Sequence, residues 1–439
     1  MRDDPLPPLP YGDRRDRVLA RLEGASMLLP AAPVRFRNGD SEYPYRPDSE
    51  LLYMTGWDTP DCIALLRGFA DEDRFVLFAP ERDPEKELWT GPRREPEEVR
   101  ALFGTDRVLA LREFAEKAPG LLAGGEGIHY RLGANEMCDR VVREALRTGR
   151  RERARSGAGP WMVADPGTIL DPLRVRKDPA EIARMREAAR ISVAAFGEAL
   201  PSVREGAGEW EVQAALEAGF RGRGANGAAF ATIVAAGANA CTLHYSANCA
   251  RIGADDLVLV DAGAEFDFYA ADITRTVPAA GRLEGARGEV YEVVRDAHGA
   301  AVAACVPGGT LDAVHQAAVR GIVVGLVAAG ILKQTVDEVL ERETYRRFFP
   351  HRTSHWLGLD THDAGPYRDR DGPLRLEPGM VFTVEPGLYF APGSGADTAG
   401  IEGTGIRLED DVLVTPQGAE VLTAGLPLDP AALAELAGG

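Results

Sequence analysis

The chain has 439 residues, more than one hydrophobic core usually supports, so its length predicts two domains. Apolar residues make up 45% of the sequence and charged residues 27%, which is typical of a globular protein in water. The net charge of −18 argues against nucleic acid as a partner, because binding to a phosphate backbone requires a cationic face.

The amino-terminal sequence MRDDPLPPLP has two aspartates, four prolines and no apolar run, so we expect no secretory signal. The apolar run GIVVGLVAAGIL at 321–332 is twelve residues long, too short to span a bilayer, and predicts a buried helix rather than membrane association. Five scattered cysteines, an odd number, fit reduced thiols. These features predict a cytoplasmic protein.

The first third of the chain mixes short apolar runs, such as CIALLRG and DRFVLFAP, with charged helical stretches such as EPEEVRALFG. This mixture indicates an α/β unit. The segment RRERARSGAGP at 150–160 is basic and then rich in glycine and proline, which is typical of a domain boundary. We therefore predict an amino-terminal α/β domain over 1–170 and a second domain over 171–439.

The second domain opens with a strong helix signal. Asp178 suits an N-cap, Pro179 suits the first helical position, and Glu181 completes a capping box. Further helices are predicted over 288–304, 311–330 and 336–348. Between the helices lie the strand-like runs FATIVAA, DLVLVDAG, FYAADITRTV, MVFTVEP and GIRLEDDVLVT. Helices and strands without strict alternation favour an α+β fold.

Three of the seven histidines, His351, His355 and His362, fall within HRTSHWLGLDTHD at 351–363. His351 and His355 would share a helix face, but a zinc helix with this spacing needs glutamate after the first histidine, where the chain has Arg352. Gly358 and the proline before the segment also argue against a helix. The segment is either a surface loop with incidental histidines or part of a metal site with its other ligands elsewhere.

Four carboxylates lie in apolar, strand-like sequence: Asp261, Asp272, Glu385 and Glu409. Acidic residues disfavour strands, and a buried unpaired carboxylate is costly. We expect the connection at 262–264 to fold the runs carrying Asp261 and Asp272 into a hairpin. Arg275 and Arg407 stand close by in sequence, but two arginines cannot neutralise four carboxylates.

Two divalent metal ions would balance four carboxylates, with one histidine as a neutral ligand. An oxygen-rich ligand set suits hard or borderline ions such as Mn²⁺. Two ions about 3.5–4 Å apart can share a water, lower its pKa and polarise a carbonyl. The residues therefore predict hydrolytic chemistry.

The ordered motifs VDAG, ADITRT, SHWLGLDTHD, TVEPGLYF and GIRLEDD resemble those of the metal-dependent aminopeptidase P and proline dipeptidase group. That group is related to methionine aminopeptidase and creatinase and shares the pita-bread fold. The segment DSEYPYRPDSELLYMTGW at 40–57 resembles the family's first domain, so the resemblance covers nearly the whole chain. It implies a pita-bread catalytic domain over 171–439 behind a smaller α/β domain over 1–170.

The resemblance implies five metal ligands: Asp261, Asp272, His355, Glu385 and Glu409. In this pattern Asp272 and Glu409 bridge two ions, and we expect these to be Mn²⁺. His355 binds one of them, and Asp261 binds mainly the other.

Further residues match positions around the substrate in this family. His351 and His362 correspond to residues that line the pocket. His244 resembles a histidine near the scissile carbonyl, and Arg407 resembles a group that steadies the acidic site. Trp89 resembles an aromatic of the first domain that reaches a neighbouring subunit's active site, so we expect a homodimer or homotetramer.

The activity implied is removal of the first residue from peptides with proline at the second position, by attack of a metal-bridging hydroxide. Glu385 would carry the proton from water to the departing nitrogen, while His362 and His244 would hydrogen-bond the oxyanion. In one departure, many family members have glycine where this chain has Arg352, which leaves the accepted substrate size open.

Two alternatives remain. A proline dipeptidase would use the same metals on Xaa-Pro dipeptides only, and the SHWLGLD motif together with Trp89 favours the aminopeptidase over it. A catalytically silent pita-bread binding protein is disfavoured because all five ligands are present. We expect His298 and His315 to lie on helices, partly exposed or capping, without a role in the site.

Overall fold

The computed structural model describes residues 6–394 and 400–437. The described residues divide into two compact units, one over 9–172 and the other from 173 onward, with residues 6–8 belonging to the second. The boundary predicted at 170/171 and the division between Pro172 and Leu173 both fall within helix α7 (Gly167–Val175).

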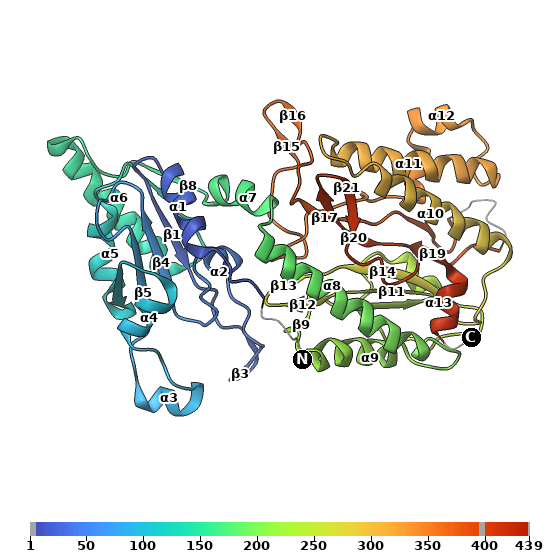
Figure 1. The fold of residues 1–439 in the computed structure, drawn as a ribbon, viewed down its shortest axis with the longest axis horizontal. Coiled ribbons are helices and arrows are strands. Elements are labelled where there is room, and N and C mark those ends of the chain that lie inside the picture. The colour runs from blue at the N-terminus through green and yellow to red at the C-terminus, as the bar shows by residue number, and fades with distance from the viewer. Residues whose placement is uncertain (1–5, 395–399, 438–439) are drawn as a thin grey trace. The chain divides into compact units, whose positions relative to one another are not determined.

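The amino-terminal unit is built on a six-stranded mixed sheet in the order β6-β5-β4-β1-β7-β8 (Figure 1). Its strands are β1 (Ser26–Pro30), β4 (Ile63–Arg67), β5 (Phe75–Ala79), β6 (Arg107–Ala110), β7 (Gly127–His129) and β8 (Met162–Ala164). The runs CIALLRG and DRFVLFAP form β4 and β5. Their side chains are buried almost without interruption, as continuous apolar sequence in a covered sheet requires.

Helices cover this sheet, and a small hairpin of β2 (Phe36–Asn38) and β3 (Ser41–Glu42) lies apart from it. The helices are α1 (Tyr11–Arg21), α2 (Ser49–Thr55), α3 (Pro84–Thr90), α4 (Pro96–Phe103), α5 (Phe114–Leu122) and α6 (Glu136–Ser156). The side chains of Leu28, Leu65, Phe78 and Phe114 meet in its core. The predicted α/β character of this part of the chain is confirmed.

The carboxy-terminal unit mixes helices with short antiparallel sheets. Its helices are α8 (Pro179–Ala199), α9 (Glu209–Gly222), α10 (Gly285–Ala303), α11 (Leu311–Ala328), α12 (Val336–Glu341) and α13 (Pro430–Leu436). Figure 1 shows α8 and α9 along one side of the strands and α10 and α11 along the other. The α+β prediction is confirmed.

Two helix predictions can be compared in detail. Helix α8 begins with the expected capping box, in which the Asp178 carboxylate accepts hydrogen bonds from the backbone N–H groups of Ala180 and Glu181. The helix predicted over 336–348 ends instead at Glu341, and a separate 3₁₀ turn covers Thr344–Arg347. Glu343 adopts a left-handed backbone with φ of 51°, which breaks the helix.

Helix α11 is long and apolar enough, by length and composition, to cross a membrane. Core helices of globular proteins pass the same test. Its residues Val314, Ile322 and Leu326 are fully buried in two apolar clusters of this unit, as predicted for a core helix.

The strands of this unit form small sheets with the orders β10-β11-β14, β13-β12-β9, β17-β20-β21, β18-β19 and β15-β16. Their bounds are β9 (Gly227–Ala228), β10 (Ile233–Ala236), β11 (Leu257–Ala262), β12 (Ala264–Phe266), β13 (Tyr269–Ala270), β14 (Ile273–Pro278), β15 (Arg368–Asp369), β16 (Gly372–Pro373), β17 (Val381–Val384), β18 (Gly387–Phe390), β19 (Thr404–Arg407), β20 (Asp410–Thr415) and β21 (Gly418–Val421). A bridge between Thr274 and Glu409 connects β14 to the β19–β20 junction.

The expected tight hairpin at 262–264 is wrong. Strands β11 and β14 do pair antiparallel, with Asp261 opposite Thr274, but the chain between them makes a second hairpin, β12–β13. At the crossing point, a Cβ on Gly263 would lie 1.7 Å from the carbonyl oxygen of Ala271. After the β12–β13 hairpin the chain continues into β14, and Asp272 lies directly before this strand.

This crossing predicts a strong requirement for glycine at position 263. We expect Gly263→Ala to lower the free energy of unfolding by about 3 kcal/mol, because the new methyl group forces two backbone segments apart. Gly299→Ala is the matched control: it lies in helix α10 with nothing within 4 Å of the added Cβ, and should be neutral or stabilising by up to about 1 kcal/mol. Calorimetric unfolding of both variants measures the difference, and equal stabilities would contradict it.

Candidate metal centre

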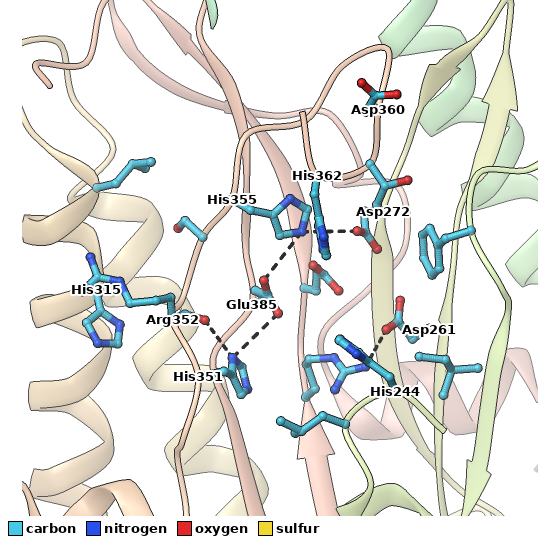
Figure 2. Close-up of a pocket in the computed structure, with 18 of the residues that line it drawn as sticks. His244, Asp261, Asp272, His315, His351, Arg352, His355, Asp360, His362 and Glu385 are labelled. Carbon is cyan, nitrogen blue, oxygen red and sulfur yellow. Dashed lines mark hydrogen bonds and ion pairs between the residues drawn. The ribbon is translucent and has the colours of Figure 1, made fainter. Parts of the chain in front are cut away.

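The four predicted carboxylates and His355 line one pocket in the carboxy-terminal unit (Figure 2). Asp261 lies in β11, Asp272 directly before β14, Glu385 directly after β17, and Glu409 between β19 and β20. Asp261, Asp272 and Glu409 are at least nine-tenths buried, and Glu385 is partly buried. Strand ends from three sheets therefore bring the acidic side chains together.

His355 faces these carboxylates. Its Nε2 lies 3.5 Å from Asp272 Oδ2 and 3.7 Å from Glu385 Oε1, while its Nδ1 lies 3.0 Å from the carbonyl oxygen of Trp356. Donation from Nδ1 to that carbonyl leaves the Nε2 lone pair directed at the carboxylates, as a metal-ligating histidine requires. Ligand atoms of Asp272, His355 and Glu409 all lie within 4.8 Å of one another.

The pKa shifts of these carboxyl groups indicate that the cluster lacks neutralising positive charge. Burial and the charge of Glu409 raise the pKa values of Asp272 and Glu385 well above the usual range. Burial and the charge of Asp261 raise the pKa of Glu409 to about 7. Among the described residues, the buried Oδ1 atom of Asp261 has no hydrogen-bond partner. An orphaned carboxylate oxygen in a buried acidic cluster is the donor that a divalent cation fits.

Arg407 lies against this cluster. Its Nη2 donates to Asp261 Oδ2 at 2.5 Å, its Nη1 to the Tyr389 hydroxyl at 3.0 Å, and its Nε to Thr274 Oγ1 at 3.1 Å. The Thr274 hydroxyl in turn donates to Glu409 Oε2 at 2.6 Å. In the described part of the chain, this is the one arginine or lysine ion pair that the four carboxylates form.

Arg275 is not a partner of these four carboxylates. Its Nη2 donates to Asp410 Oδ1 at 2.7 Å, and His298 Nε2 lies 3.1 Å from the other oxygen of Asp410. Burial raises the pKa of Asp410, but Arg275 and His298 outweigh it and lower that pKa to about 2. The expectation that His298 is partly exposed is wrong: it is 2% exposed and lies against the buried carboxylate of Asp410.

The pocket also brings together the predicted substrate-side histidines, His244, His351 and His362. The His351 Nε2 lies 2.9 Å from the Tyr389 hydroxyl, and its Nδ1 lies 3.9 Å from Glu385 Oε2. Burial lowers the pKa of His351 to about 4 and also lowers that of His362. The His362 ring stands edge-on to His355, with ring centroids 4.4 Å apart.

Sequence reasoning missed His315, which was expected to have no role in the site. It projects from α11 into the same pocket, and its Nδ1 lies 2.8 Å from Thr353 Oγ1. Burial lowers its pKa to about 4. No local signal marks it, because its position depends on how α11 packs against the histidine segment. Trp89 lies in the other unit, on α3, where its side chain is 86% exposed.

The histidine segment is irregular rather than helical, and a buried ion cluster holds it. The Asp363 carboxylate accepts from Arg174 Nη2 at 2.5 Å and from Lys177 Nζ at 3.0 Å, and Arg174 also donates to Asp360 Oδ2 at 2.7 Å. A Cβ on Gly358 would lie 2.3 Å from Asp363 Oδ2. Asp363 directly follows His362, so this cluster fixes the backbone that presents His362 to the pocket.

Comparison with known proteins places the chain in a family. Residues 183–416 match the model of metallopeptidase family M24, and residues 11–129 match the aminopeptidase P amino-terminal domain. The chain is 37% identical to the Xaa-Pro aminopeptidase of Escherichia coli over 419 residues, 95% of each protein. Xaa-Pro aminopeptidase 1 of Streptomyces coelicolor is 32% identical, covering 94% of this chain and 84% of the relative.

Solved structures agree with this assignment. Aminopeptidase PepP of Pseudomonas aeruginosa superposes with a TM-score of 0.92 at 41% identity, covering 98% of this chain and 97% of that one. Zinc-substituted E. coli aminopeptidase P in complex with product gives a TM-score of 0.92 at 37% identity, with 97% of both chains covered. The chain belongs to metallopeptidase family M24. It is a hydrolase that binds divalent metal, and the predicted pita-bread fold is confirmed.

The buried ion cluster predicts that two basic residues adjacent in sequence differ sharply in how much their loss destabilises the fold. Lys177→Met should lower the free energy of unfolding by about 3 kcal/mol, because it removes one partner of a buried charge network. Arg176→Met is the matched control, since Arg176 pairs with Glu377 at the surface and its loss should cost about 0.5 kcal/mol or less. Scanning calorimetry measures both, and similar losses for the two variants would count against the network.

Proposed function

We propose that this protein is an Xaa-Pro aminopeptidase: it hydrolyses the first peptide bond of peptides with proline at the second position. The observation that carries this proposal is the buried, under-neutralised set of four carboxylates facing His355, within a chain that matches Xaa-Pro aminopeptidases along nearly its whole length.

The proposed ligands are Asp261, Asp272, His355, Glu385 and Glu409, holding two ions. Asp272 and Glu409 would contribute to holding both ions, His355 to one of them, and Asp261 mainly to the other. Four carboxylates with one buried guanidinium leave room for several positive charges, which supports two ions rather than one. The oxygen-rich donor set favours Mn²⁺.

Two ions held here would supply a water of lowered pKa and polarise the scissile carbonyl. Glu385 is the proposed proton carrier, taking the proton of the attacking water and delivering it to the departing proline nitrogen. His362 and His244 would donate hydrogen bonds to the carbonyl oxygen as it gains negative charge. His351, held by Tyr389, would form a wall against the proline ring.

Further proposals concern the domains, the assembly and the location of the protein. We propose that residues 1–170 form a separate amino-terminal α/β domain and that residues 171–439 form the catalytic domain. Trp89, an exposed aromatic, is proposed to contact the active site of a neighbouring subunit in a homodimer or homotetramer. A cytoplasmic location is proposed because all five cysteines are free thiols.

The ligand assignment predicts metal content. Wild-type protein should hold about two Mn²⁺ per chain by elemental analysis, as two-metal hydrolases do. Asp261→Ala should reduce this to about one, since it contributes mainly to one ion, and Glu409→Ala should abolish tight binding, since it contributes to both. Asp371→Ala, an exposed acidic residue outside the pocket, is the control and should leave the content unchanged. Equal losses in the Asp261 and Glu409 variants would refute the division of roles.

The activity is tested with metal-stripped and Mn²⁺-restored protein on an Xaa-Pro dipeptide and an Xaa-Pro-Xaa tripeptide. We expect metal-dependent cleavage of the tripeptide, and a loss in kcat of about 100-fold in His362→Ala, the size expected for one oxyanion donor. Cleavage of the dipeptide alone would make the protein a proline dipeptidase. Failure to cleave either peptide, with metal bound, would leave a silent binding protein.

A further inference from the structure

A cationic lip, formed by Arg352, Arg368 and Asp312, lies on the wall of the same pocket. Arg352 directly follows His351, Arg368 lies in β15, and Asp312 lies in the first turn of α11. The Arg352 guanidinium donates to Asp312 Oδ1, and Arg368 Nη1 lies 3.5 Å from Asp312 Oδ2. Three distant segments thus place two guanidiniums around one carboxylate.

The charges of this lip do not cancel. Two arginines share one aspartate, which leaves one net positive charge. The neighbouring His315 adds no charge near neutral pH, because burial lowers its pKa to about 4. The side chains of Arg352 and Arg368 are 60% and 66% exposed, so both guanidiniums have donors that face open solvent.

The lip and the metal centre give the pocket two ends of opposite charge. Figure 2 shows Arg352 and His315 on one side of Glu385, with Asp261 and His244 on the other. A short peptide has matching polarity, an ammonium group at one end and a carboxylate at the other. A tripeptide spans about 10 Å when extended, which is the scale of a single pocket. Glu385, the proposed proton carrier to the leaving amine, stands between the two ends.

We propose that the cationic lip binds the terminal carboxylate of short peptides, with Arg352 as the principal donor. The enzyme therefore prefers peptides of a few residues with a free carboxy terminus over longer or amidated ones. Guanidinium suits this role because its fixed fork of N–H donors matches both oxygens of a carboxylate. This inference rests on the proposed aminopeptidase function and names its substrate class.

A purely structural role for the lip gives a different expectation. An ion pair this exposed adds little to stability, so the fold should tolerate loss of Arg352. If the lip only held the histidine segment against α11, its loss would change kcat/KM for every substrate alike. A carboxylate-binding lip affects only substrates that carry the carboxylate, and Asp312, which competes for the same guanidiniums, should oppose it.

The test compares Xaa-Pro-Leu with its carboxy-terminal amide, using Mn²⁺-restored protein. Wild type should favour the free acid in kcat/KM by about fivefold, the range of one partly exposed ion pair, and the preference should fall with added salt. Arg352→Met should bring the ratio close to one. Asp312→Asn should raise it, because both guanidiniums are released. The control is Arg375→Met. Arg375 is exposed, lies shortly after Arg368 in sequence and does not line the pocket, so this variant should keep the wild-type ratio.

Equal kcat/KM for acid and amide in wild type, or a ratio that Arg352→Met leaves unchanged, overturns the inference while the aminopeptidase function stands. If neither peptide is cleaved, the proposed function fails. The lip is then judged on the same protein by calorimetric titration with the two peptides. Tighter binding of the free acid that Arg352→Met abolishes supports the lip, and equal or undetectable binding of both peptides overturns it.

Discussion

The repulsion among four buried carboxylates is the constraint on which the catalytic unit depends. Asp261, Asp272, Glu385 and Glu409 meet where strand ends converge, and the guanidinium of Arg407 balances one charge. Left without further cations, the site takes up protons instead, as the raised pKa values of three of them indicate. Folding therefore assembles a carboxylate cluster that is destabilising without metal and becomes favourable once divalent metal is bound.

The surrounding groups hold this arrangement rigidly. Thr274 links Arg407 to Glu409, and Tyr389 links Arg407 to His351. Hydrogen bonds therefore connect the carboxylates of the pocket to its histidines. Arg275 donates to the backbone carbonyl oxygen of Glu409 at 2.6 Å and also to the Asp410 carboxylate. Hydrogen bonds within this network thus help to hold the polar interior in place.

Local sequence signals predicted the parts of this molecule that local physics determines. The capping box at Asp178 was readable because a cap and its helix are neighbours in sequence, and buried carboxylates stood out in apolar runs. Ordered motifs resembling a known family identified the pocket residues and the fold. The hairpin at 262–264 was predicted wrongly because a steric approach of Gly263 to Ala271, invisible in sequence, sets the crossing.

Two further features that sequence reasoning missed involve residues far apart along the chain. The partners Lys177 and Asp363 are 186 residues apart, and neither has a local feature that marks it as buried. His298 lies on a helix whose pattern fits partial exposure equally well. In the folded chain its Nε2 lies 3.1 Å from Asp410 Oδ2, a contact between residues far apart in sequence. Propensity and periodicity cannot report such pairs, because both describe neighbours along the chain.

The junction between the two units has a consequence for how this protein can be divided. The match to the metallopeptidase family begins at residue 183, which suggests a natural place to cut. Arg174 and Lys177 lie before that point, yet their charges anchor the segment that carries His362. A chain shortened to the family match would retain every proposed metal ligand but leave Asp363 buried without its cations. A fragment that keeps both cations of Asp363 must therefore begin within α7, upstream of Arg174.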